Sequence, residues 1–204
     1  MKYIKEIFDV TTFEHAKHVV LTSDPDNPDK FVNETNFLIN TIAEQLTNEM
    51  NEDSVVLDFG CGMGRVSKGL IDKFNCKVIG LDISDSMLTF ARLYTANIQK
   101  FQATKSYTEP ESIDVCLSIL ALQHAENPES EINNIVKVLK PNGILILVNE
   151  HKRFVPSDID KNRFVIWEDD GYDIFGHIET LLTKLNSVKY LNSNLDVIFY
   201  RKEA

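Results

Sequence analysis

The stretch Val55-Val-Leu-Asp-Phe-Gly-Cys-Gly-Met-Gly-Arg65 determines how the rest of this 204-residue chain is interpreted. Its β-branched start predicts a buried strand, and residues 65–74 are predicted to form a helix. Gly60, Gly62 and Gly64 lie between the two, so a bulky ligand can rest against backbone that carries no side chains. The first N–H groups of the helix would point at the same place. The sequence therefore predicts a ligand site on this turn.

Strands and helices continue to alternate on the C-terminal side of the turn. Further strands are predicted from short apolar runs at residues 77–82, 98–103, 113–119 and 144–148. One helix is predicted to begin after Ser84, and a second after Asn127 with Pro128 at its first position, because these residues favour helix N-termini. The sequence Lys140-Pro-Asn-Gly143 is expected to end the second helix. This alternation is typical of a parallel sheet whose crossovers are helices.

The C-terminal region is expected to close the sheet. Residues 178–185 outline a helix, and the runs 188–191 and 196–200 are close enough to favour a hairpin. The predicted fold is α/β: a Rossmann-like, doubly wound, mostly parallel sheet with an antiparallel C-terminal hairpin strand. Residues 51–204 would form this domain, and residues 1–50 a helical segment in front of it, within one globular domain overall.

Composition and charge exclude several classes of partner. The formal net charge of −10 argues against nucleic acid as a partner, because nucleic-acid binders usually carry a basic patch. The three cysteines show no paired spacing, so neither a disulfide framework nor a metal site is expected. Reduced thiols in a cytoplasmic protein are expected instead. The longest apolar run, at residues 115–122, is too short to span a membrane, and the N-terminus does not resemble a signal peptide.

Two acidic residues help to distinguish between the classes of ligand that such a glycine turn could bind. A dinucleotide fold favours G-x-G-x-x-G, but Arg65 stands where the third glycine is required. Asp58 would repel a pyrophosphate and suits a cationic ligand. Asp82, at the end of the next predicted strand, is placed to accept hydrogen bonds from ribose hydroxyls, although a ribose occurs in both ligand classes. The alternative is a plain tight turn in which Asp58 only caps the helix.

Three stretches carry a resemblance to a known family. Val56-Leu-Asp-Phe-Gly-Cys-Gly-Met-Gly-Arg65, Gly80-Leu-Asp-Ile-Ser84 and Val138-Leu-Lys-Pro-Asn-Gly-Ile-Leu145 resemble the successive motifs of class I S-adenosylmethionine (SAM)-dependent methyltransferases. The resemblance covers roughly residues 53–150 and implies a seven-stranded sheet with an antiparallel last strand. It also implies SAM as cofactor and S-adenosylhomocysteine (SAH) as product.

The same resemblance implies which residues bind the cofactor. The methionine part would be held by Asp58, Gly60, Cys61, Gly62 and Gly64. The ribose would be held by Asp82, and the faces of the adenine by Ile83 and Met87. Ser118, in the fourth strand, completes the set. Many relatives have an acidic residue after the third strand, but this chain has Gln102-Ala-Thr-Lys105, so Thr104 or a backbone carbonyl is expected to replace it.

Methyl transfer from a sulfonium is an in-line displacement, so positioning and exclusion of water can supply much of the catalysis. A hydroxyl or ammonium acceptor also needs a base. His124 follows the fourth strand, where relatives often have a histidine, and Glu150 and His151 follow the fifth. Each has a plainer interpretation: His124 bonds its own loop, and the other two are solvated loop residues.

The missing motifs reduce the number of classes to which the methyl acceptor could belong. There is no Asn-Pro-Pro-Tyr run at the fourth strand, where Ser118-Ile-Leu-Ala121 stands, and no Pro-Cys nucleophile. The best interpretation is O- or N-methylation of a small molecule by a monomer or homodimer, with residues 1–50 as a lid. The alternatives are a protein or RNA methyltransferase, a SAM-binding subunit without catalysis and, from another class, a dinucleotide-dependent oxidoreductase. A closed aromatic pocket, to which Trp167, Tyr172 and Phe175 are candidates to contribute, would favour the small molecule.

Overall fold

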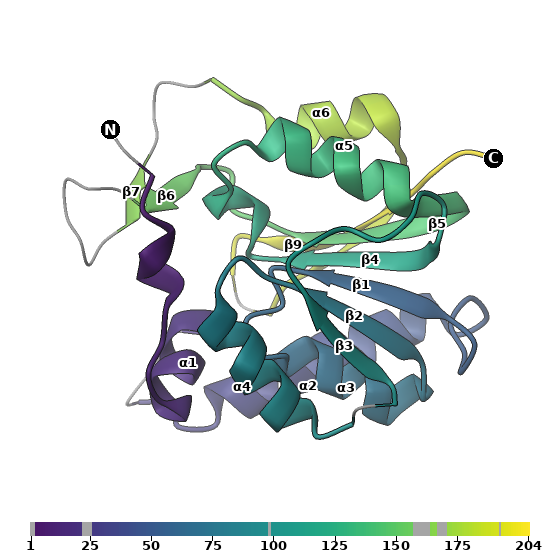
Figure 1. The fold of residues 1–204 in the computed structure, drawn as a ribbon. Helices are drawn as coiled ribbons and strands as arrows, with labels where there is room; N and C mark the ends of the chain where they lie inside the picture. The colour runs from purple at the N-terminus through teal and green to yellow at the C-terminus, as the bar shows by residue number, and fades with distance from the viewer. Residues whose placement is uncertain (1–2, 22–25, 98, 157–163, 167–170, 192) are drawn as a thin grey trace. The chain divides into compact units, whose positions relative to one another are not determined.

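The fold is seen in a computed structural model, which describes residues 3–21, 26–97, 99–156, 164–166, 171–191 and 193–204 (Figure 1). Seven strands form one sheet in the order β3-β2-β1-β4-β5-β9-β8, and β6 and β7 form a separate pair. β9 runs antiparallel to both β5 and β8, whereas β1/β2, β2/β3 and β4/β5 are parallel. The predicted α/β class, with an antiparallel strand near the C-terminus, is confirmed. The chain divides into two compact units, residues 8–106, and residues 1–7 together with 107–204.

The unit of residues 8–106 contains the glycine turn. Its elements are α1 (Phe13–Val20), α2 (Lys30–Gln45), β1 (Val55–Phe59), α3 (Arg65–Phe74), β2 (Lys77–Leu81), α4 (Asp85–Thr95) and β3 (Phe101–Thr104). Leu38 and Ile42 in α2, and Leu46 at its C-cap, recur at intervals of about one helical turn and are all buried. Ser84 caps α4 by accepting a hydrogen bond from the Met87 N–H, so the predicted N-cap is present.

The second unit contains the remaining strands and helices. Its elements are β4 (Ile113–Ile119), η2 (Leu122–His124), α5 (Pro128–Val138), β5 (Leu139–Val148), β6 (Phe154–Pro156), β7 (Phe164–Ile166), α6 (Ile174–Leu181), β8 (Thr183–Lys189) and β9 (Asp196–Arg201); the short helix η1 (Lys5–Phe8) lies at its N-terminal boundary. Asn127 caps α5 through the Ser130 N–H, with Pro128 at the first helical position. Residues 144–148 are fully buried, as expected of a central strand.

The segment 140–143 differs from its prediction as a simple helix stop. It belongs to β5, which begins at Leu139, directly after α5. The register with β4 shifts there, so that these four residues bulge out of the ladder. Asn142, at φ 65°, donates its N–H to the Lys202 carbonyl, and Lys202 donates to Gly143. Pairing with the C-terminal residues therefore holds this turn as a bulge of β5, directly after the helix has ended.

The predicted helix over residues 178–185 is wrong in its second half. α6 ends at Leu181, and the Leu182 backbone is extended. Leu185 lies in β8, which pairs with β9, and is 43% exposed at the position where the register between these two strands shifts. Leucines at helical spacing also fit the start of a strand, and the long-range pairing decides between the two. No helix in the part of the chain that the structure describes is long and apolar enough to cross a membrane.

Candidate functional site

The glycine turn is built almost entirely from left-handed backbone. Gly60, Gly62 and Gly64 have φ values of 68°, 52° and 79°, which side-chain-bearing residues rarely adopt. The Gly60 and Cys61 N–H groups donate to the Leu81 carbonyl at 2.8 and 3.0 Å. A Cβ atom at Gly62 would overlap the Cγ1 atom of Val20. Three glycines are therefore required by conformation, and one of them also by space.

Asp58 lies at the end of β1, directly before this turn, and is only 3% exposed. Its Oδ2 atom accepts a hydrogen bond from the Ser67 hydroxyl at 2.5 Å. Burial raises the pKa of the Asp58 carboxyl to about 6; the Ser67 hydrogen bond and the Arg65 charge oppose this shift, and Asp82 adds to it. A buried carboxylate with a raised pKa beside the glycine turn is suited to a cationic group, which would favour its charged form.

Asp82 has a structural role that sequence reasoning missed. Its Oδ2 atom accepts from the Gly62 N–H at 2.8 Å, and its Oδ1 atom accepts from the Ser84 N–H at 2.9 Å. The carboxylate therefore joins the glycine turn to the start of α4. Burial raises the pKa of Asp82, and these backbone hydrogen bonds partly offset the rise. A carboxylate has about four acceptor sites, so with the Gly62, Ile83 and Ser84 N–H groups bound, Asp82 can accept a further hydrogen bond from a hydroxyl group.

The N-terminal segment, residues 9–20, covers these elements within the same unit. The Ser84 hydroxyl donates to Asp9 at 2.9 Å, and the Val10 N–H donates to the Ser86 hydroxyl at 2.8 Å. Sequence reasoning missed both contacts, because they join residues about 75 positions apart. The segment is thus fixed by hydrogen bonds to the loop that follows Asp82.

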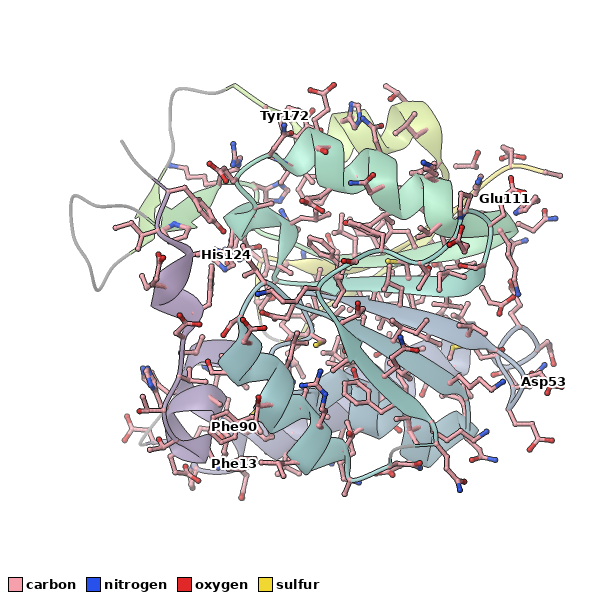
Figure 2. The ribbon with its side chains drawn as sticks, in the orientation of Figure 1. Phe13, Asp53, Phe90, Glu111, His124 and Tyr172 are labelled. Atoms are coloured by element: carbon pink, nitrogen blue, oxygen red, sulfur yellow. The ribbon has the colours of Figure 1, made fainter. Side chains whose placement is uncertain are left out.

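An apolar cluster completes this cover. Its buried members are Val10, Ala16, Met63 and Met87, and its half-buried members are Val19, Val20, Phe31, Phe90 and Tyr94. The Phe13 ring lies 6.3 Å from Phe90 and 5.7 Å from Tyr94, and Figure 2 shows Phe13 and Phe90 side by side. The N-terminal segment therefore packs on the glycine turn through Met63 and on α4 through Met87 and Phe90.

The other residues predicted to bind the adenine differ in accessibility. Ile83 is 45% exposed, whereas Met87 is 2% exposed inside the apolar cluster. The Thr104 hydroxyl forms hydrogen bonds only within residues 104–106, and the Thr104 carbonyl accepts the Asp82 N–H at 3.3 Å. Lys105 pairs with Asp85 at 2.9 Å. Thr104 therefore supports Asp82 through its backbone, and its predicted adenine contact stays a prediction.

In the second unit, two amides join the loops that follow β4 and β5. The Asn149 side chain accepts the Gln123 N–H at 3.0 Å and donates to the Glu150 carbonyl at 2.8 Å. The Gln123 side chain accepts the Glu150 N–H at 2.8 Å. Gln123 and Asn149 are both buried. This amide clamp, Gln123 with Asn149, fixes the backbone on which two predicted catalytic residues, His124 and Glu150, are carried.

The predicted catalytic residues of this unit lie at the same end of β4 and β5 but in different settings. His124 is half-buried in η2, with its Nε2 atom 3.5 Å from the Gln123 side-chain nitrogen. Glu150 is half-buried, and the exposed His151 packs its ring 5.1 Å from Phe175. Ser118 is fully buried in β4, and its hydroxyl has no hydrogen-bond partner among the described residues. Their catalytic and binding roles stay predictions.

The proposed aromatic wall is only partly seen. Phe175 contacts His151, and the Tyr172 ring lies 5.8 Å from His177. Trp167 lies outside the described residues. Across the same described parts of the chain, His, Cys, Asp and Glu side chains form no group of three that could hold a metal ion.

Comparisons with known proteins agree with the sequence motifs. Residues 57–147 match the family described as "Methyltransferase domain". The chain is 33% identical over 106 residues to a ubiquinone biosynthesis O-methyltransferase of Azoarcus sp. (strain BH72), which covers 48% of this chain and 45% of that protein. It is 35% identical over 104 residues to a sterol 24-C-methyltransferase of Clavispora lusitaniae (strain ATCC 42720), covering 47% of this chain and 28% of that protein. The chain spans less than half the length of these two curated relatives.

The solved structures show similarity of fold. The [4+2]-cyclase SpnF superposes with a TM-score of 0.63 at 13% identity, over 82% of this chain and 81% of that one. At this identity the likeness carries no information on the reaction. The sequence motifs and the matched domain are therefore stronger evidence about the reaction than the similarity of fold.

Proposed function

We propose, from the premise that this chain carries a class I SAM-dependent methyltransferase domain at residues 57–147, that it methylates an oxygen or nitrogen atom of a small molecule. One observation carries the proposal: the buried Asp58 carboxylate stands at the entrance of a left-handed glycine turn that Asp82 fixes from the other side. This pairing suits a ligand with a cationic end and a ribose. SAM has both, since it contains an ammonium, a sulfonium and a ribose.

The residues of the first unit fit such a cofactor. Val20 of the N-terminal segment occupies the space over Gly62, so the bare backbone of the turn would meet a ligand when that segment moves away. Asp58 would hold the ammonium, and the free lone pairs of Asp82 would accept the ribose hydroxyls. Ile83 and Met87 would pack against the adenine. Met87 belongs to the buried apolar cluster, which would hold its side chain in place. When bound, SAM supplies an electrophilic methyl group.

The candidate residues for handling the acceptor would lie on the loops after β4 and β5. His124 would take the proton of a hydroxyl or ammonium acceptor, because an imidazole titrates near neutral pH. Glu150 and His151 are the other candidates from the loop after β5. The amide clamp would keep the two loops in one arrangement and so lower the cost of positioning the acceptor. Ser118, with its buried hydroxyl, would serve the cofactor.

The N-terminal segment would act as the cover of the cofactor site, within the region predicted as a lid. It contacts the glycine turn, the loop after Asp82 and α4, which are the three elements assigned to the cofactor. Such a cover excludes water from the site, as a methyl transfer requires. Cofactor exchange would then need the segment to move away, because Val20 lies against Gly62.

Small-molecule acceptors are favoured over macromolecules by the acidic charge and by the relatives. The net charge of −10 disfavours a phosphate-rich acceptor. The curated relatives include proteins named for ubiquinone biosynthesis and for a sterol, both small molecules. The sterol enzyme's name refers to a carbon atom, so an acceptor screen should include carbon nucleophiles beside phenols, carboxylates and amines.

Calorimetry with two ligands tests the cofactor assignment. SAH is expected to bind in the micromolar range and NAD not to bind, because a carboxylate at the turn repels a diphosphate. Binding of NAD alone would overturn the assignment. A metabolite screen for transfer of labelled methyl groups from SAM then tests the acceptor class; labelling of RNA or protein alone would exclude the small molecule.

A further inference from the structure

We propose that Ser67 is a positioning residue for cofactor binding: its hydroxyl orients the Asp58 carboxylate and keeps it in the charged form that a cationic cofactor requires. The inference rests on the proposed function, since it concerns the same site. Ser67 does not belong to the glycine turn, and none of the three motifs includes it. It acts through Asp58 and not by contact with the ligand.

The contact between the two residues is short and entirely buried. The Ser67 Oγ atom donates to the Asp58 Oδ2 atom at 2.5 Å, Ser67 is 0% exposed and Asp58 is 3% exposed. Water therefore cannot replace the hydroxyl if it is removed without rearrangement of the core. A hydrogen bond to a charged acceptor in such surroundings is stronger than one between neutral groups.

The direction of the hydrogen bond links the contact to charge. A deprotonated carboxylate can only accept, so the Ser67 hydroxyl donates the hydrogen bond to Asp58. This arrangement favours the charged carboxylate and lowers its pKa against the larger effect of burial. Ser67 lies in the first turn of α3, three residues after Gly64, so helix formation itself brings the hydroxyl to the end of β1.

The other charged and titratable groups around Asp58 act from farther away. Arg65, also on α3, opposes the burial effect through space, but its guanidinium donates to Thr35 at 3.1 Å and lies over the Phe31 ring. Asp82, from the loop after β2, raises the Asp58 pKa by repulsion. The Cys61 thiol in the turn has a strongly raised pKa and stays neutral. Ser67 is thus the residue that bonds the Asp58 carboxylate directly.

The pH dependence of ligand binding follows from this geometry. A cationic ammonium binds the charged carboxylate, so affinity should be complete above the Asp58 pKa of about 6 and fall as the pH drops through it. Removal of the Ser67 hydroxyl should raise that pKa, and the midpoint of the affinity profile should move upward. A serine with a merely structural role would leave the midpoint where it is.

Isothermal calorimetry with SAH from pH 5 to pH 8, at constant ionic strength, measures this profile. For Ser67→Ala the midpoint should rise by about one pH unit, which at pH 6 corresponds to a loss of several-fold in affinity. Ser67→Thr, which retains the hydroxyl, should restore the original midpoint. Ser54→Ala is the matched control: Ser54 is buried immediately before β1, at its opposite end, where it accepts the Asn51 N–H. Its midpoint should equal that of the original protein.

A measurement without ligand separates this inference from the proposed function. Carbon-13 NMR of the Asp58 carboxyl in the cofactor-free protein should give a midpoint near 6, and a higher one in Ser67→Ala. An unchanged carboxyl midpoint in a folded Ser67→Ala protein would overturn the inference, as would an equal shift in Ser54→Ala. If the carboxyl midpoint moves as expected but SAH binds at no pH, the positioning of Asp58 stands and the proposed cofactor is wrong.

Discussion

The glycine turn, with the Asp58 and Asp82 carboxylates beside it, and the loops after β4 and β5 are held in place in different ways. At the turn, the two carboxylates accept hydrogen bonds from the Ser67 hydroxyl and the Gly62 N–H, and three glycines adopt left-handed backbone. The loops after β4 and β5 are held instead by the amide clamp, between residues 26 positions apart. The conformation of the first region therefore depends on glycines and two carboxylates, and that of the second on two amides. Such a division suits the proposed function, in which one region binds a fixed cofactor and the other a variable acceptor.

Gly62→Ala should have the largest effect on SAH affinity. Unchanged affinity would mean that the conformation of the glycine turn does not depend on this glycine. The new Cβ atom would overlap Val20 and would hold a left-handed φ of 52°. Strain and overpacking together cost about 2–4 kcal/mol, or on the order of a hundredfold in SAH affinity. Calorimetry gives the affinity. Gly171→Ala is the control, because Gly171 has a φ of 57° but open space around its Cβ position; equal losses in both variants would refute the role of space.

Asp82→Ala should come next, because it removes acceptors from two backbone N–H groups as well as from the ribose. We expect a loss of about 1–3 kcal/mol in SAH binding and a lower melting temperature. The neighbouring Asp85→Ala changes an exposed carboxylate that pairs with Lys105, and should leave affinity unchanged. Retention of full SAH affinity in Asp82→Ala would mean that the ribose is held elsewhere.

Gln123→Ala tests whether the two regions are independent, since it disturbs the loops after β4 and β5 and leaves the glycine turn intact. The half-buried Glu150 N–H would lose its acceptor, which costs about 1–2 kcal/mol of unfolding free energy. Chemical denaturation measures this loss, and SAH affinity should change less than about threefold. Gln102→Ala, on the exposed face of β3, serves as control. A large loss of SAH affinity in Gln123→Ala would show that the two regions do not act separately.

Asp9→Asn should have the smallest effect, on rates more than on affinity. It weakens the hydrogen bond that holds the N-terminal segment to Ser84. Stopped-flow measurements should then show SAH association and dissociation both faster by a few-fold, since loss of a surface-accessible polar contact costs about 1 kcal/mol. Asp53→Asn, at an exposed position before β1, should keep the original rates. Unchanged rates in Asp9→Asn would argue against the segment as a moving cover.

The sequence predicted best what is local. The strand at 55–59, the helix at 65–74 and the caps at Ser84 and Asn127 are confirmed, because each depends on neighbouring residues. It failed where long-range pairing overrides local pattern. Leu185 lies in β8, which pairs with β9. Residues 140–143 belong to β5, where Lys202 supplies hydrogen-bond partners for Asn142 and Gly143.

The site was predictable only in part for the same reason. Glycines and acidic residues at motif spacing identify the turn, but nothing near Ser67 in the sequence reveals that its hydroxyl meets Asp58. The N-terminal segment shows an amphipathic pattern without a visible partner until Met63 and Met87 are seen beneath it. The amide clamp has no sequence pattern, because a buried Gln or Asn is recognised only by what it bonds.

The burial of Met63 and Met87 has a chemical consequence. Both thioethers lie in the apolar cluster beneath the N-terminal segment, at 0% and 2% exposure. A peroxide can reach them only when that segment lifts, and conversion to the polar sulfoxide would hinder its return. Oxidative damage would therefore accumulate in molecules whose segment is displaced, and a bound ligand that keeps it in place would protect them.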